Sequence, residues 1–112
     1  DAIRDREKLG FEINQLLESY DLLLTPAMPT AAFDAGIEVP TGSGMRRWTE
    51  WTPFSYPFNL TQHPAASVPC GFTSDSMPAG LQIVAAKYRE YKVFSASAAY
   101  EAICPFKMPT SD

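Results

Sequence analysis

The sequence has a single histidine and only two cysteines among its 112 residues, and this scarcity excludes several classes of site. Cys70 and Cys104 are too few for a disulfide framework, and they lack the C-x-x-C spacing of redox and zinc motifs. One histidine and two distant cysteines match no common metal-ligand spacing. We therefore expect no metal and no cofactor, and we expect both thiols to be reduced and buried in a cytoplasmic protein.

Positive charge and long apolar runs are also scarce. Nine Lys and Arg residues face thirteen Asp and Glu residues, the net charge is -4, and Arg46-Arg47 is the one notable basic pair. This balance argues against nucleic-acid binding through a basic surface. No apolar run approaches the roughly 20 residues that span a bilayer, so we expect no membrane insertion. The start, "DAIRDREKLG", lacks the order of a signal peptide, and because it begins at Asp1 we expect the natural polypeptide to start upstream.

The residues that are present predict an α/β fragment. With 46% hydrophobic and 20% charged residues, the chain can build one small core. Residues 2–20 show helical periodicity, although Gly10 weakens that helix by about 1 kcal/mol relative to alanine. The expected buried face of this helix is Leu9, Ile13, Leu16, Leu17 and Tyr20.

Three apolar runs predict strands, and a second periodic run predicts a closing helix. Residues 22–25 read as a fully buried strand, and residues 65–70 and 80–86 read as a hairpin joined by a turn at 71–78. Residues 90–103 read as a helix, and residues 107–112 as a frayed tail. The sequence therefore predicts three strands with two flanking helices. Two helices can hardly cover both faces of such apolar strands.

A long connection and an aromatic stretch separate the first strand from the hairpin. Residues 26–49 are rich in Pro, Gly, Thr and Ala and have no periodicity, which is rare unless a loop is functional or is packed by another segment. Residues 48–60, "WTEWTPFSYPFNL", are densely aromatic, and their prolines allow only a short helical turn.

No set of side chains in the sequence makes a complete active site. His63 lacks a motif that links it to a carboxylate, so we expect a turn histidine bonded to the backbone. Ser67 reads as a core hydroxyl, and Cys70 has no neighbouring cation that would activate it. Lys87 and Lys92 are expected to be solvated. The glycines of "TGSGM" lack the Lys-Ser/Thr of a phosphate loop, so a flexible loop is the better interpretation.

Two motifs carry a family resemblance. "PFNLTQHPAASVPCGFT" at 57–73 and "MPAGLQIVA" at 77–85 resemble the C-terminal segment of amidase-signature enzymes, which read N-L-T-G-x-P-A-x-S-V-P-C-G and then L-P-x-G-L-Q-[IL]-[VI]-G. "YDLLLTPAMPTAAF" at 20–33 and "SAAYE" at 97–101 extend the likeness. The resemblance implies that residues 1–112 are a single partial domain, the C-terminal part of a mixed-sheet α/β amidase domain several times larger.

The resemblance also implies a hydrolase that cleaves carboxylic amides through a Ser–Ser–Lys triad. No residue of this chain matches the nucleophile, the relay serine or the lysine base, so we expect the isolated chain to be inactive. Two departures matter. Gln62 replaces the usual glycine after N-L-T, which questions the left-handed geometry of that turn. Ala85-Ala86 replaces the usual glycine after Q-I-V, so the strand is expected to run on further.

The resemblance implies that the loops of this chain help to close a substrate pocket. The expected pocket-lining residues are Met28, Phe33, Trp51, Thr52 and Phe54, with packing under the long loop as the alternative role. Their aromatic character favours an apolar or aryl amide. The expected partners are the N-terminal part of the amidase domain, an amide substrate and, because strand edges and apolar faces are left open, further copies of the chain.

Two other functions stay open. One is a non-catalytic interaction or scaffold module in which the amidase-like residues survive only because they fold. The other is a fragment of an amidotransferase A-type subunit, which shares the same C-terminal pattern and requires partner subunits.

Overall fold

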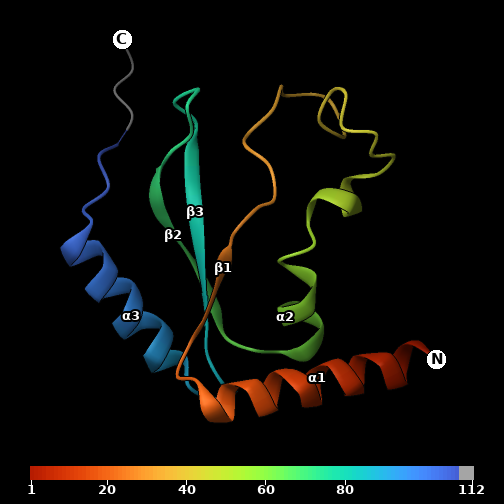
Figure 1. The fold of residues 1–112 in the computed structure, drawn as a ribbon, viewed down its shortest axis with the longest axis vertical. Helices are drawn as coiled ribbons and strands as arrows, with labels where there is room; N and C mark the ends of the chain where they lie inside the picture. Colours follow the sequence, from red (N-terminus) through yellow and green to blue (C-terminus); the bar gives the residue numbers. More distant parts are fainter. Residues whose placement is uncertain (109–112) are drawn as a thin grey trace.

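The computed structural model describes residues 1–108 and contains three helices, a 3-10 turn and three strands. Of the tail expected to fray, residues 109–112 lie outside the described part of the chain. The elements, in chain order, are α1 (Ala2–Ser19), β1 (Leu23–Pro26), the 3-10 turn (Trp48–Trp51), α2 (Tyr56–Thr61), β2 (Ala65–Phe72), β3 (Pro78–Val84) and α3 (Glu90–Ile103) (Figure 1).

The three strands form one antiparallel sheet with β3 in the middle, in the order β1-β3-β2. The predicted hairpin is confirmed, since β2 pairs with β3 along its whole length apart from an irregularity between Pro69 and Gly71. Gln82 of β3 lies opposite Thr25 of β1 and Ser67 of β2. Paired residues share a face, so these three polar side chains form one row across the sheet. The predicted α/β class is confirmed.

Helix α3 covers one face of the hairpin. It packs against β2 and β3, and Val93 is its buried residue. On this face Ile83 is 2% exposed, whereas its neighbour on β1, Leu24, is 56% exposed. The prediction of a fully buried first strand is therefore wrong, because the helix reaches β2 and β3 and leaves Leu24 on the far strand uncovered.

The core lies where α1, α2 and the end of β3 meet. It contains Ile13 and Leu17 of α1, Phe58 of α2 and Val84 of β3. The first predicted helix is confirmed, but Leu16 and Tyr20 are exposed and do not belong to its buried face. The helix runs across the base of the sheet and contacts α2 (Figure 1), so it buries only a narrow stripe of residues, Gly10, Ile13 and Leu17.

The two departures from the family pattern have different outcomes. Gln62 ends α2 with φ 62° and ψ 36°, so the turn keeps its left-handed geometry although the residue is not glycine. Strand β3 ends at Val84, so the prediction that it continues through Ala85 and Ala86 is wrong. The backbone instead turns, with Arg89 N donating to Ala86 O at 3.1 Å.

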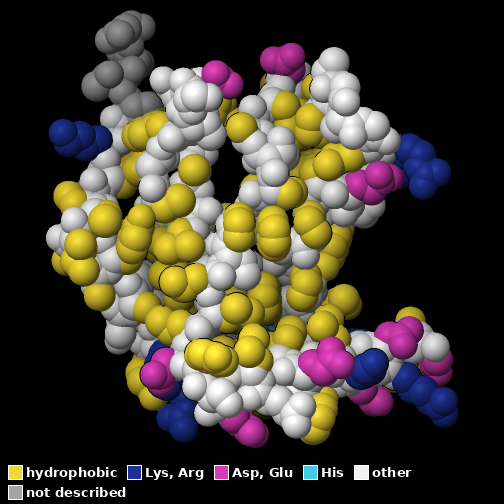
Figure 2. Space-filling view, in the orientation of Figure 1, with side chains coloured by type: hydrophobic (Ala, Val, Ile, Leu, Met, Phe, Trp, Pro, Cys, Tyr) yellow, Lys and Arg dark blue, Asp and Glu magenta, His cyan; other side chains and the backbone are white. Residues whose placement is uncertain are grey.

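The described part of the chain is flat and open. Its radius of gyration is 16.1 Å, and its extents are 46 × 39 × 17 Å, whereas a compact domain of this length has a radius of about 13 Å. Hydrophobic side chains spread over the visible face of the sheet and α3, while charged groups gather along α1 and the loop (Figure 2). Large exposed apolar side chains include Ile3, Phe11, Tyr20, Leu24, Tyr88, Phe94 and Ile103. An apolar surface of this extent is typical of a face that another segment covers.

Candidate functional site

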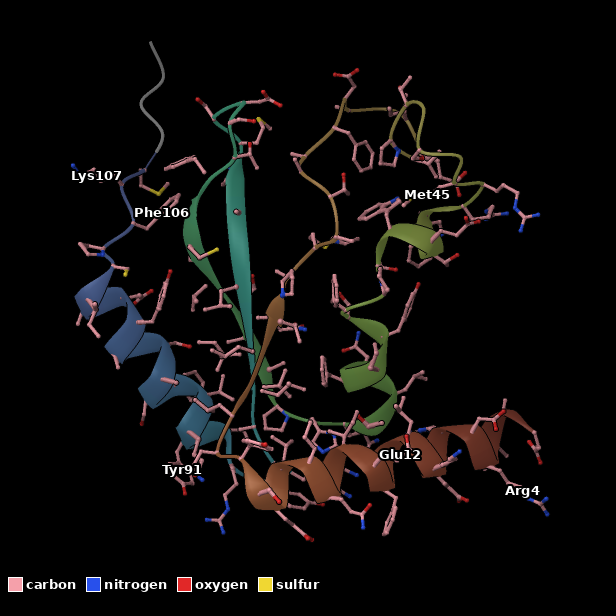
Figure 3. The ribbon with its side chains drawn as sticks, in the orientation of Figure 1. Arg4, Glu12, Met45, Tyr91, Phe106 and Lys107 are labelled. Atoms are coloured by element: carbon pink, nitrogen blue, oxygen red, sulfur yellow. The ribbon has the colours of Figure 1, made fainter. Side chains whose placement is uncertain are left out.

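Both ends of the long loop, residues 27–54, are held by β3. At its start Ala27 N donates to Gly80 O at 2.9 Å. At its end Phe54 O accepts from Gln82 Nε2 at 2.9 Å, and the same nitrogen donates to Thr25 Oγ1 at 2.8 Å. Figure 3 places Met45, within this loop, on the opposite side of the sheet from Phe106. One strand thus fixes where the loop leaves the sheet and where it returns.

Inside the loop, Glu38 binds the 3-10 turn through both its side chain and its backbone. Its Oε1 accepts from Arg47 Nε at 3.0 Å and from Trp48 N at 3.2 Å. Its carbonyl accepts from Trp51 Nε1 at 2.9 Å. The ring of Phe33 packs edge-on against Trp51, with centroids 5.4 Å apart. The loop is therefore internally bonded, although it contains no strand or helix before residue 48.

The five predicted pocket residues lie on or beside this loop. Phe33 and Trp51 are in contact, and both are half-buried. Thr52 Oγ1 donates to Thr49 O at 3.2 Å, and Phe54 is half-buried beside the sheet. Met28 is exposed near the start of the loop. The structure thus brings Phe33 and Trp51 into contact, and the lining of a pocket by the five residues stays a prediction.

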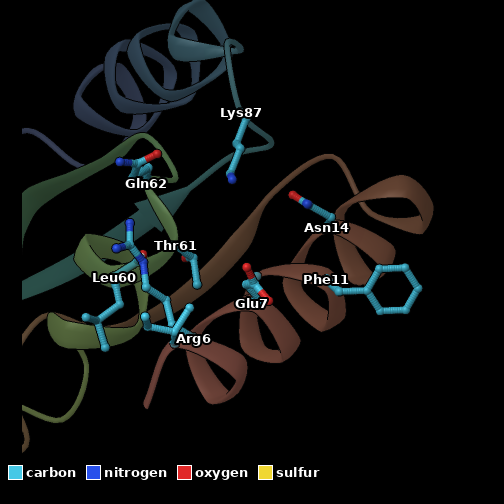
Figure 4. Close-up of a pocket in the computed structure, with 10 residues that line it drawn as sticks. Arg6, Glu7, Phe11, Asn14, Leu60, Thr61, Gln62 and Lys87 are labelled. Atoms are coloured by element: carbon cyan, nitrogen blue, oxygen red, sulfur yellow. The ribbon is translucent and has the colours of Figure 1, made fainter. Parts of the chain in front are cut away.

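A hollow of about 470 Å³ lies elsewhere, between α1 and the turn that joins α2 to β2 (Figure 4). Arg6, Glu7 and Asn14 border it from α1, and Gln62 and Lys87 border it from the other side. Arg6 Nε donates to Leu60 O at 2.6 Å and so ties the helix to α2.

The buried histidine joins α1 to this turn. His63 Nδ1 lies 2.8 Å from Thr61 Oγ1, and Nε2 lies 3.0 Å from Asn14 Oδ1. The backbone N–H of this turn histidine donates to Phe58 O at 3.2 Å, whereas the ring has two side chains and no backbone group as partners. Thr61 Oγ1 donates to Pro57 O at 2.7 Å. Because Thr61 and His63 are both buried and an amide, not a carboxylate, faces Nε2, the trio of hydroxyl, imidazole and amide is a structural link and not a nucleophile with its base.

The charge state of His63 follows from its surroundings. Burial lowers the pKa of His63, and the neighbouring ammonium of Lys87 lowers it further. The neutral imidazole is therefore the favoured form in the folded chain. Lys87 is half-buried and borders the hollow.

Three further expectations from the sequence are corrected. Cys70 and Cys104 are both exposed, not buried. Ser67 is exposed and is not a core hydroxyl, because the polar row to which it belongs lies on a face that no helix of residues 1–108 covers at β2. Lys92 is not simply solvated: its Nζ lies 2.5 Å from Asp21 Oδ1, and this contact lowers the pKa of Asp21.

Residues 1–108 show neither a metal site nor a membrane span. No cluster of three or more His, Cys, Asp or Glu side chains in this range is arranged to hold a metal ion. No helix in the same range has the length and apolar character that crossing a membrane requires.

Comparison with known families decides what kind of chain this is. The family model described as Amidase matches residues 1–94, most of the chain. The chain belongs to the amidase family. The A-type subunit of the glutamyl-tRNA(Gln) amidotransferase of Pediococcus pentosaceus is 43% identical over 93 residues, which cover 81% of this chain and 18% of that protein. An acylamidase of Rhodococcus erythropolis is 36% identical over 94 residues, covering 80% and 20% respectively.

A solved structure agrees with this assignment. The A-type subunit of the Thermotoga maritima glutamyl-tRNA(Gln) amidotransferase superposes with a TM-score of 0.78 at 32% identity, covering 96% of this chain and 23% of that one. This amidase-family chain therefore spans about a fifth of the length of the relatives that it matches.

Two residues that organise the amidase-family loop were missed by sequence reasoning. Gln82 had a visible signal, since it is a polar residue inside an apolar strand and part of the "GLQ" motif. Glu38 had none, because a single acid in an aperiodic loop is ordinarily solvated and its partners lie nine to thirteen positions further along.

Proposed function

We propose that residues 1–112 are a single partial domain, the C-terminal part of an amidase domain whose enzyme hydrolyses carboxylic amide C–N bonds. The observation that carries this proposal is a mismatch of size. The amidase family model matches most of the chain, yet the chain spans about a fifth of its relatives and forms a flat, open sheet. Such a sheet requires neighbours, and the remainder of an amidase domain supplies them.

In this proposal the chain supports the catalytic centre and forms part of the wall of its substrate pocket, but it does not carry the catalytic residues. The Ser–Ser–Lys triad implied by the family lies on the rest of the domain, where one serine attacks the carbonyl, the second relays a proton and the lysine is the base. Met28, Phe33, Trp51, Thr52 and Phe54 form part of the substrate wall. Their aromatic character favours an apolar or aryl amide over a charged amino acid.

Assembly and location follow from the same surfaces. Outside a complete domain, the free edges of β1 and β2 favour association with further copies of the chain. Sedimentation analysis is expected to show a dimer or a larger species, and a stable monodisperse monomer would argue against this part of the proposal. We place the enzyme in the cytoplasm, where two exposed thiols stay reduced.

An amidotransferase component is the second candidate, and the 43% identity to the A-type subunit from Pediococcus pentosaceus favours it. The two candidates differ in the amide that is cleaved and in the need for other subunits. A non-catalytic scaffold module is the third possibility, in which no added segment creates turnover.

The deciding experiment is complementation. The chain is expressed alone, and also joined to or together with the preceding part of an amidase domain, and hydrolysis of a 4-nitroanilide and of glutamine is measured. We expect no turnover from the chain alone and anilide hydrolysis from the combination. Turnover that copurifies with the isolated chain would refute the proposal, as would a combination that folds without hydrolysing either amide.

A matched pair of variants controls for folding. Ile83→Asp places a charge at a buried position of β3 and is expected to abolish complementation. Phe94→Asp alters a side chain that is 73% exposed and leaves the fold of the chain intact. Its effect reports whether the apolar outer side of α3 contacts the rest of the domain.

A further inference from the structure

The row of polar side chains across the sheet has an unusual centre. Thr25, Gln82 and Ser67 lie side by side on β1, β3 and β2. Gln82 is half-buried, and its amide nitrogen uses both of its protons, one for Thr25 Oγ1 and one for Phe54 O. A primary amide has two donors, so this nitrogen is fully occupied in joining the sheet to the end of the long loop.

The Phe54 carbonyl is the contact that matters. It lies in the link between the 3-10 turn and α2, so no helix or strand ladder fixes it. Trp51 and Thr52 lie three and two positions before it, and Trp51 is bonded to Glu38 and packed on Phe33. Because the loop is internally bonded, a shift at Phe54 moves this aromatic group as a unit relative to the sheet.

We propose that Gln82 is a positioning residue that sets the distance between the sheet and the wall formed by Trp51, Thr52 and Phe54, and thereby the fit of the amide substrate. This inference rests on the proposed function only for its last step. The link between Gln82 and the aromatic wall stands on the two hydrogen bonds alone.

The chemistry of the side chain explains why glutamine is suited to this place. Asparagine is one methylene shorter and cannot span the same gap to both acceptors. Glutamate has no donor and directs a carboxylate at the Phe54 carbonyl, where two acceptors repel each other. Methionine has a similar length and fills the space without a donor, so Gln82→Met removes the bonds and keeps the volume.

The two tryptophans of the chain, Trp48 and Trp51, both lie in the 3-10 turn, so intrinsic fluorescence reports on this wall. In a Trp48→Phe background, Gln82→Met is expected to shift the Trp51 emission to the red and to increase its quenching by acrylamide. The matched control is Thr25→Val, which removes one Gln82 bond and keeps the bond to Phe54; it is expected to leave the emission unchanged. Equal spectra for Gln82→Met and its background, with circular dichroism showing a folded chain, would overturn the proposal.

A measurement on the unaltered chain guards against a variant that fails to fold. Nuclear Overhauser contacts are expected between the side-chain amide protons of Gln82 and protons of both Thr25 and Phe54, with exchange slower than that of an exposed glutamine. Fast exchange without these contacts would overturn the proposal.

Kinetics separate this inference from the proposed function. In the longer polypeptide that hydrolyses amides, Gln82→Met is expected to raise KM for an aryl amide with little change in kcat, while Thr25→Val keeps both. A red shift with an unchanged KM would retain Gln82 as the positioning residue of the loop and refute the assignment of that wall to the substrate pocket.

Discussion

Replacing Gln62 with glycine tests whether the turn after α2 stores backbone strain. Gln62 has φ 62° and ψ 36°, and a non-glycine residue in this left-handed region loses about 1–2 kcal/mol to the contact between Cβ and the carbonyl. Glycine avoids that contact but costs about 0.5–1 kcal/mol in backbone freedom. The side chain is exposed, so its removal uncovers no buried surface. The free energy of unfolding is therefore expected to rise by about 0.5–1 kcal/mol.

Urea denaturation followed by circular dichroism measures this change. With a slope of about 1.5 kcal/mol/M, the midpoint is expected to move up by about 0.3–0.7 M at unchanged slope. Gln62→Ala is the matched control, because it removes the side chain and keeps Cβ and its strain. The reasoning fails if Gln62→Gly has the same midpoint as Gln62→Ala, or a lower one.

Three further changes probe the core, the sheet and the buried histidine. Phe58→Ala, in the core, is expected to lower the free energy of unfolding by about 3–5 kcal/mol. The exposed control, Phe94→Ala, is expected to change it by under about 0.5 kcal/mol. Similar losses for the two variants in urea melts would contradict the observed burial. Gly80→Ala places Cβ 2.9 Å from Ala27 Cβ, which has no rotamer to escape to, and 2.8 Å from Ser67 Oγ, and is expected to cost about 1–3 kcal/mol, measured by thermal melting; an unchanged melting temperature would disprove the close contact. Because the pKa of His63 is lowered from 6.5, the unfolded state binds more protons than the folded state, and stability is expected to fall as the pH drops below about 6.5. Urea midpoints at about pH 7.5 and 5.5 measure this loss of stability. A loss of the same size in His63→Gln would show that His63 is not its cause.

The sequence predicts those parts of the fold whose signals are local. It predicts the helix at Glu90–Ile103 with the bounds that the structure shows, because a proline follows it and apolar positions recur within it. The hairpin is equally accessible, since two apolar runs flank a turn rich in Ser, Asp and Gly. Neither prediction requires knowledge of anything distant in the chain.

The burial of a side chain and its hydrogen-bond partners cannot be predicted from local signals in the same way. Cys70, Cys104 and Ser67 stand in or beside apolar runs that favour burial, but burial depends on what covers a face, and all three are exposed within residues 1–108. His63 bonds Asn14 across 49 positions of sequence, and no local pattern indicates such a contact. The loop candidates rest on family resemblance alone, whereas the two bonds of Gln82 show how that loop is attached to the sheet.

The central strand of the sheet is the last of the three to be synthesised. Until β3 leaves the ribosome, β1 and β2 lack the strand with which each pairs, and β1 is complete at Pro26 while its partner begins at Pro78. At about 5–20 residues per second this interval lasts several seconds. During that time β1 has no partner strand, and β2 joins it unpaired from Phe72 until β3 follows, so the nascent chain is open to chaperone capture or intermolecular pairing before its own sheet can form.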